Sequence, residues 1–282
     1  MLVREAIERF ERGLIGQGAS RNTVSTYKRH LNRFVGLLGE KQIEEVGNAD
    51  LNEFLYTVRL KEDGTEKTPR TMNSIKTALK SLFRSLNLKE DPAKRIRIKR
   101  VRIVRDYITP EEVRKLLDGV AKTRDRTLIG VLCLLGLRRE EIARTTIRDI
   151  CGPTLRILGK GGVERDIPIN QTARELLDRF LHWKERHGES LSPEAPLFVS
   201  RKGNPLSMDA IYNLVRKWTR EILGKELYPH AMRHSFATML VAKNVNIATI
   251  QRLMGHASIS MTEVYLHISN ELKTEAVERL EV

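Results

Sequence analysis

Apolar positions recur at three- and four-residue intervals through the first ninety residues, a spacing that places them on one face of a helix. The pattern predicts four helices, over about residues 3–14, 22–38, 49–60 and 68–88. On the last of them Lys76, Lys80 and Arg84 share one face, because they are four residues apart. The spacing fits a face that lies against a phosphate backbone and a solvated surface equally well.

Beyond residue 107, helical periods surround a short stretch with strand character. Helices are predicted over about residues 110–120, 124–135, 138–146, 171–187, 207–223, 230–243, 246–254, 258–267 and 270–280. Residues 154–158 and 164–169 are typical of two strands joined by a tight glycine-rich turn, and residues 147–150 could add a third strand. We therefore expect a mainly α-helical chain with a small antiparallel sheet in its second half.

The length of 282 residues is about twice that of a common domain, so two domains are expected. The Asp91–Pro92 step ends the first helical run, because a residue before proline avoids the helical region. A basic connector follows, in which seven Lys and Arg residues face two Asp residues over positions 91–106, a net charge of +5. The predicted division is thus 1–90, a linker 91–106, and 107–282. The linker could be an extended segment that follows phosphates or a β-strand at a basic sheet edge.

The formal net charge of +14 favours a polyanionic partner, most often nucleic acid. Two cysteines are too few for a disulfide framework or a zinc module. The longest uncharged apolar stretch, residues 128–137, is about half the length that spans a bilayer, and the N-terminus lacks the apolar core of a signal peptide. A soluble cytoplasmic protein is expected. Arg outnumbers Lys and Gln is scarce, which points weakly to a heat-adapted source.

The candidate metal and phosphate-loop motifs are incomplete. His230 and His234 are one helical turn apart, as in a zinc pair, but Ala231 occupies the position where metalloproteases carry glutamate. The turn at residues 159–162 displays Lys160 but lacks the Ser or Thr and the preceding glycine of a P-loop. We therefore expect no metal site and no cofactor.

The basic residues of the second half are arranged more suggestively. Arg138 follows a glycine that ends an apolar helix, so it is expected at a helix start, where backbone N–H groups favour anions. His230 and Arg233 share one face at a helix N-terminus. His256 follows Gly255 at a helix end, and Tyr265 lies one short helix further on.

Together these segments resemble the tyrosine recombinase (phage integrase) family. The resemblance is carried by LLGLRREEI around Arg138, HAMRHSFAT at 230–238, LMGH ending at His256 and MTEVYLHI around Tyr265, with Gly159-Lys160-Gly161 similar to the β-hairpin lysine motif. It implies a helical, SAM-like core-binding domain at 1–90 and a catalytic domain at 107–282. In its compact length the chain most resembles the Xer subgroup. Met232 stands where that subgroup usually has leucine, a change that nearly conserves side-chain volume.

The resemblance also implies roles for six residues, without metal or cofactor. Tyr265 is the nucleophile that forms a covalent 3′-phosphotyrosine, and Arg138 and Arg233 bind the non-bridging phosphate oxygens. His256 adds a donor, Lys160 protonates the leaving 5′-oxygen, and His230 supports Tyr265 as a base or by holding its hydroxyl.

The partners implied by the family are a double-stranded DNA recombination site and further copies of the chain, a dimer on one site and a tetramer in synapsis. The last helix has an apolar face that fits either a neighbour's groove or its own domain, formed by Leu272, Ala276, Val277 and Leu280. The expected function is site-specific recombination for chromosome dimer resolution. The alternatives are a plasmid or virus integrase, a topoisomerase-like enzyme, and a non-catalytic DNA-binding protein on the same fold.

Overall fold

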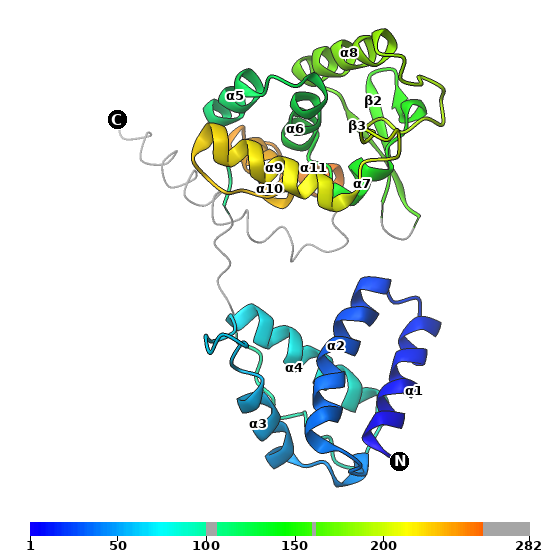
Figure 1. The fold of residues 1–282 in the computed structure, drawn as a ribbon, viewed down its shortest axis with the longest axis vertical. Coiled ribbons are helices and arrows are strands. Elements are labelled where there is room, and N and C mark those ends of the chain that lie inside the picture. Colours follow the sequence, from blue (N-terminus) through cyan, green and yellow to red (C-terminus); the bar gives the residue numbers. More distant parts are fainter. Residues whose placement is uncertain (100–105, 160–161, 256–282) are drawn as a thin grey trace. The chain divides into compact units, whose positions relative to one another are not determined.

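The computed structural model describes residues 1–99, 106–159 and 162–255 (Figure 1). It divides into two compact units, Met1–Ile103 and Val104–Val282, which we call the N-terminal and C-terminal units. The described chain is mostly helical with one small antiparallel sheet, which confirms the predicted fold class. The helices predicted over 258–267 and 270–280, with the proposed docking face, lie outside the described residues, as do Lys160, His256 and Tyr265.

The N-terminal unit contains the four predicted helices and one 3₁₀ turn. They are α1 (Val3–Gly16), α2 (Arg21–Leu38), η1 (Ile43–Glu45), α3 (Asn48–Thr57) and α4 (Pro69–Leu86). Their apolar faces meet in one core, where the ring of Phe34 lies edge-on to those of Phe54 and Phe83 at centroid distances of 5.0 and 6.3 Å. Helix α4 ends earlier than the Asp91–Pro92 step, because Asn87 takes the left-handed conformation, with φ of 49°.

The described part of the basic connector, residues 91–99, packs on the N-terminal unit. Ala93 is fully buried in its core. Lys80 Nζ donates to the carbonyl oxygens of Ala93, Lys94 and Ile96 at 3.4, 3.3 and 3.2 Å. Lys76 Nζ donates to Arg97 O at 3.1 Å. Lys76 and Lys80 on the α4 face thus bind carbonyl groups of the chain's own backbone. The sequence had suggested a phosphate-binding face or a solvated surface for these residues. This segment forms a turn and an extended stretch, and no strand pairing is found in residues 91–99.

The C-terminal unit is built around α6 (Thr123–Leu135), a helix whose last eight residues carry no polar side chain. Its helices are α5 (Pro110–Gly119), α6 (Thr123–Leu135), α7 (Arg139–Arg144), α8 (Gln171–Arg186), α9 (Met208–Leu223), α10 (Pro229–Ala242) and α11 (Ile247–Met254). Helix α6 packs against α5, α8 and α10 (Figure 1), and nine of its thirteen residues are buried. A capping box begins α5, where Thr109 N donates to Glu112 Oε2 and Glu112 N donates to Thr109 Oγ1.

The sheet has the order β1–β2–β3, with strands Ile150–Cys151, Thr154–Leu158 and Glu164–Pro168. The β2–β3 pairing is antiparallel, with Ile157 opposite Arg165, which confirms the predicted hairpin. The third strand was predicted too early. Residues Ile147–Asp149 form a 3₁₀ turn (η2), because Asp149 accepts a hydrogen bond from Thr146 N at 2.7 Å. The strand that pairs with β2 on this side begins after the turn and consists of Ile150 and Cys151.

None of the helices in the described ranges has both the length and the apolar character to cross a membrane.

Candidate active site

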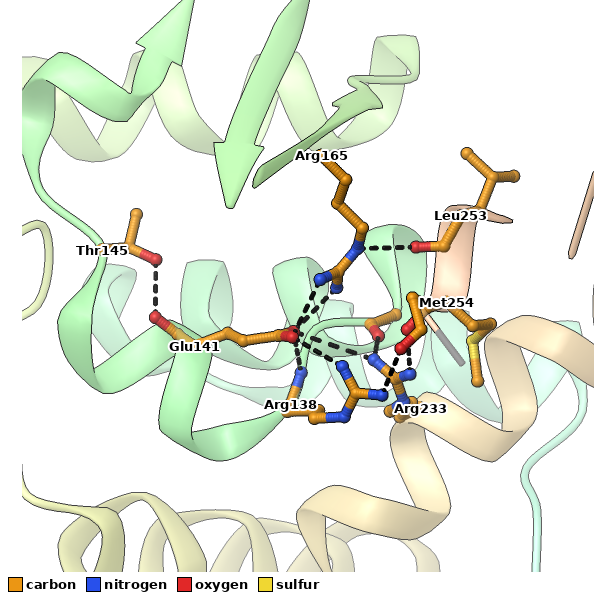
Figure 2. Close-up of polar contacts among 9 residues, drawn as sticks. Arg138, Glu141, Thr145, Arg165, Arg233, Leu253 and Met254 are labelled. Atoms are coloured by element: carbon orange, nitrogen blue, oxygen red, sulfur yellow. Dashed lines mark hydrogen bonds and ion pairs between the residues drawn. The ribbon is translucent and has the colours of Figure 1, made fainter. Parts of the chain in front are cut away.

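Three arginines and one glutamate converge in the C-terminal unit from segments far apart in the sequence. Figure 2 shows this arginine–glutamate cluster, which consists of Arg138, Glu141, Arg165 and Arg233. Arg138 is the N-cap residue of α7 and Glu141 lies in its first turn, whereas Arg165 belongs to β3 and Arg233 to α10. The fold therefore unites a helix start, a strand and a second helix around one carboxylate.

The Glu141 carboxylate is the centre of the cluster. Only 5% of its side chain is exposed. Arg165 donates to it through both terminal nitrogens, Nη1 to Oε1 at 2.9 Å and Nη2 to Oε2 at 2.8 Å. Arg138 donates to it twice, from its backbone N and from Nη1, both at 2.8 Å. Arg233 Nη1 lies 3.7 Å from Oε2.

These contacts keep Glu141 ionised. Burial alone raises the pKa of the Glu141 carboxyl, but the hydrogen bonds and charges of Arg165 and Arg138 outweigh burial, so this pKa lies below its ordinary value. Three positive charges against one negative charge leave the cluster with a net charge of +2. A concentrated positive charge of this kind attracts an anion such as a phosphodiester.

The last carbonyl groups of α11 bind the same three arginines (Figure 2). Arg165 Nε donates to Leu253 O at 3.0 Å, Arg233 Nη2 donates to Met254 O, and Arg138 Nη2 donates to Gly255 O at 2.7 Å. The carbonyl end of a helix carries partial negative charge, so it stabilises guanidinium groups. Arg233 Nη1 also donates to Gly136 O, at the end of α6, at 2.7 Å.

The two glycines that end these helices leave room for the site. Gly136 and Gly255 have φ of +64° and +59°, which L side chains rarely adopt. A Cβ on Gly136 would lie 2.3 Å from the ring of Phe236, and one on Gly255 would lie 2.9 Å from Arg165 Nη1. Each glycine thus ends a helix, allows a close side-chain approach and presents a carbonyl to an arginine.

Of the six predicted site residues, the structure brings Arg138 and Arg233 together. Arg138 is at a helix start, as predicted, and the anion held there is the Glu141 carboxylate. Arg233 is 2% exposed, and His230 lies one turn before it in the first turn of α10, exposed to solvent. Lys160, His256 and Tyr265 lie outside the described residues, so their predicted roles stay predictions.

The sequence interpretation missed Glu141 and Arg165. Glu141 had a signal, because a glutamate three residues after a helix N-cap is typical of a capping box. Arg165 had a weaker signal. It lies two residues before Ile167 on the same strand, and residues two apart on a strand share a face. Ile167 is buried in the core, so a charged residue beside it needs a buried partner.

The possible zinc pair on α10 is divided between two environments. His234 is buried and its ring lies edge-on to that of Tyr107 at 6.4 Å, whereas His230 faces solvent. Within the described ranges, no group of three or more His, Cys, Asp or Glu side chains has the arrangement of a metal site.

Met232 fills the core position next to Arg233. It is fully buried, and Cys133 Sγ donates to Met232 Sδ at 3.5 Å. Burial raises the pKa of the Cys133 thiol to about 12, so this cysteine stays protonated and unreactive at neutral pH.

Two family models match the chain. The model described as phage integrase family matches residues 106–271, and the model described as phage integrase, N-terminal SAM-like domain, matches residues 7–90. The chain belongs to the phage integrase family. Its N-terminal unit therefore contains the SAM-like domain and its C-terminal unit the catalytic domain.

Curated relatives of this family member are tyrosine recombinases. It is 32% identical to a tyrosine recombinase of Thermosipho africanus (strain TCF52B) over 274 residues, which are 93% of this chain and 94% of the relative. It is 34% identical to tyrosine recombinase XerA of Pyrococcus furiosus over 285 residues, 98% of this chain and 93% of the relative. The chain is thus a site-specific tyrosine recombinase of the Xer type, a DNA recombinase.

A solved structure of the Tn1549 transposon integrase in complex with transposon right end DNA has the same fold. The two chains superimpose with a TM-score of 0.77 over 100% of each, at 22% sequence identity.

Proposed function

We propose that this recombinase cuts and rejoins DNA through a covalent bond between Tyr265 and a 3′-phosphate. The Tyr265 hydroxyl gives its proton to a base, its oxygen bonds to the phosphorus atom, the bond from phosphorus to the 5′-oxygen breaks, and Lys160 gives that 5′-oxygen a proton. An incoming 5′-hydroxyl reverses the step and reseals a strand. The energy of the broken bond is kept in the tyrosyl ester, so no nucleotide cofactor takes part.

The observation that supports this proposal is the net positive charge of the arginine–glutamate cluster. A phosphodiester is anionic, and its transfer reaction needs neutralisation of the charge on the non-bridging oxygens. Arg138 and Arg233 are held beside each other by fixed carbonyl and carboxylate acceptors, so little reorganisation is needed when phosphate binds. We assign both to the phosphate, His256 as a further donor, and His230 to the support of Tyr265. The two guanidinium groups neutralise the phosphate charge that a divalent metal ion would otherwise neutralise. We therefore expect the reaction to proceed in the presence of a metal chelator such as EDTA.

We further propose the arrangement of the whole chain on DNA. Residues 1–90 form the core-binding domain, the linker 91–106 follows the DNA backbone, and residues 107–282 carry out catalysis. Two copies bind one recombination site, and four form the synapse, with the last helix of each docked on a neighbour. The Xer-type relatives favour chromosome dimer resolution, in the cytoplasm, as the biological role.

The test uses a nicked suicide substrate, from which the short cleaved strand diffuses away so that the covalent adduct accumulates. Wild-type protein should form an adduct that survives a denaturing gel, with EDTA present, and Tyr265→Phe should abolish the adduct while DNA binding persists. Tyr56→Phe is the matched control, because Tyr56 is 77% exposed on α3 in the other unit.

Undiminished adduct in Tyr265→Phe would place the nucleophile on another residue. Binding by the wild type without any adduct would favour a non-catalytic DNA-binding protein. Relaxation of supercoiled plasmid without exchange between two sites would favour a topoisomerase-like enzyme.

A further inference from the structure

We propose that Arg165 is a positioning residue of the active site, which neutralises Glu141 and fixes the end of α11 so that Arg138 and Arg233 remain available to the phosphate. This inference rests on the proposed function and adds a residue that the predicted set of six does not contain.

The first support is the completeness of the Arg165 contacts. Its two terminal nitrogens form a parallel pair of hydrogen bonds with the two oxygens of Glu141, and its Nε donates to Leu253 O. Its side chain is 13% exposed. These contacts of all three guanidinium nitrogens hold Arg165 in a fixed orientation, with its bidentate edge committed to Glu141 rather than to substrate. Arg165 therefore acts through its neighbours rather than on the phosphate.

The second support is the charge balance around Glu141. With Arg165 present, the cluster has a net charge of +2. Without Arg165, the net charge is +1, and both oxygens of a buried carboxylate are left to Arg138 and Arg233. Arg233 Nη1 is already only 3.7 Å from Oε2. A tighter ion pair there would compete with the phosphate for the same guanidinium groups.

The third support is the contact of Arg165 with the end of α11. The guanidinium lies against Gly255 so closely that a Cβ there would meet Nη1 at 2.9 Å and Cζ at 3.1 Å. Met254 O and Gly255 O, on either side of this contact, are the acceptors that hold Arg233 and Arg138. Arg165 thus acts on both arginines by a second route, through the backbone that orients them.

The neighbouring strand offers a matched control. Arg156 on β2 pairs with Asp166 on β3 at 3.4 Å, and these side chains are 49% and 52% exposed. Arg156 belongs to the same hairpin as Arg165 and also pairs with a carboxylate, but among the contacts of the described residues it makes none with the arginine–glutamate cluster. Exposed pairs of this kind contribute little.

The experiment compares Arg165→Met, Arg165→Lys and Arg156→Met with the wild type in three assays. These are the single-turnover rate of adduct formation, the affinity for the uncleaved site, and thermal unfolding. We expect Arg165→Met to lower the rate about 10- to 100-fold, the range for loss of a group that orients a direct ligand. DNA affinity should stay within about threefold, because many other phosphate contacts supply it. The rate of Arg165→Lys should lie between those of Arg165→Met and the wild type, because lysine keeps the positive charge but cannot form the bidentate pair of hydrogen bonds.

Two further readouts separate positioning from mere structural support. In the Glu141→Gln background, which has no carboxylate to neutralise, Arg165→Met should cost less than it does in the wild type. Guanidinium ion added to Arg165→Ala should raise the rate of that variant and leave the wild type unchanged. A rate for Arg165→Lys and Arg165→Met within about threefold of the Arg156→Met control would overturn the inference, as would rate, affinity and stability falling together.

If Arg165→Met does not fold, the decision passes to Arg165→Lys, which preserves charge and most of the volume. If the wild type forms no adduct, the proposed function fails. If the wild type forms adduct and the Arg165 variants equal it, only the role of Arg165 fails.

Discussion

The N-terminal unit has an almost wholly apolar interior, whereas the C-terminal unit buries charged side chains. Among the described residues, His30 is the one buried polar residue in the first unit. The second unit buries Glu141, Arg233, Asp125 and Lys184, with several hydroxyl-bearing residues. Burying a charge is costly unless it is paired, and each of these four has an ionic partner.

This difference shows that the interior of the N-terminal unit serves stability alone, whereas that of the C-terminal unit also holds the site. Apart from His30, the described interior of the N-terminal unit is apolar, so its core residues can be replaced by other apolar residues of similar volume. In the C-terminal unit, part of the interior is committed to holding guanidinium groups in fixed orientations. Substitutions in each interior test this contrast.

The largest expected effect is the loss of an aromatic side chain from the apolar interior. Phe34 is fully buried and meets two other rings, so Phe34→Ala should destabilise the N-terminal unit by about 3–5 kcal/mol. Both tryptophans, Trp183 and Trp218, belong to the C-terminal unit. Denaturation followed by circular dichroism should therefore show an early transition that tryptophan fluorescence does not. Equal shifts by both probes would mean that the two interiors unfold as one.

The next effect is on chemistry. Arg233→Lys should lower the rate of adduct formation about 10²- to 10³-fold, because an ammonium group cannot replace two directed donors. Lys184→Met is the control, since Lys184 is equally buried but pairs with Glu189 away from the cluster, at 2.7 Å. That variant should keep its rate but lose stability, because removing one partner of a buried ion pair leaves the charge of Glu189 uncompensated. An equal loss of rate in both would show that buried charge as such, not its position, matters.

The smallest effect concerns His30, the polar exception of the first unit. Burial and the charges of Arg29 and Arg33 lower the pKa of His30. Between that pKa and the ordinary value of about 6.5, the unfolded chain binds more protons than the folded one, so stability is full above this window and falls as pH falls through it. The slope cannot exceed that of one proton. His30→Gln should flatten the pH dependence of the unfolding of the N-terminal unit, and an unchanged slope would assign it to another group.

Much of the fold could be predicted because the buried face of a helix appears in the sequence as apolar residues spaced three and four positions apart. Helix α2 begins one residue before its predicted start and ends at the predicted Leu38. The errors arose where side chains compete with the backbone. Thr146 and Asp149 close a 3₁₀ turn where a strand was expected, and Asn87 ends α4 in a left-handed conformation that periodicity does not record.

The site was predictable only as far as its motifs reach. Arg138 and Arg233 were found because each lies in a recognisable segment. Glu141 and Arg165 acquire their meaning from tertiary contacts, since 24 residues separate them and the α11 carbonyls come later still. Main-chain acceptors leave no signature in the residue type that carries them, so the LMGH motif pointed to His256 and gave no sign that Leu253 O and Met254 O bind the arginines.

Helix α11 receives the arginines with oxygens that every amino acid possesses. The chemistry of those acceptors does not depend on the side chains of Leu253 and Met254. Met254 is nevertheless 1% exposed in a small core with Phe236 and Ile250, so its replacement must remain apolar to keep the helical path. Residue type matters at the donors and at Gly255, because an arginine supplies the directed forks and a Cβ on Gly255 would meet Arg165 Nη1 at 2.9 Å. The site is thus held by acceptors that belong to the path of the main chain and by donors that belong to particular side chains.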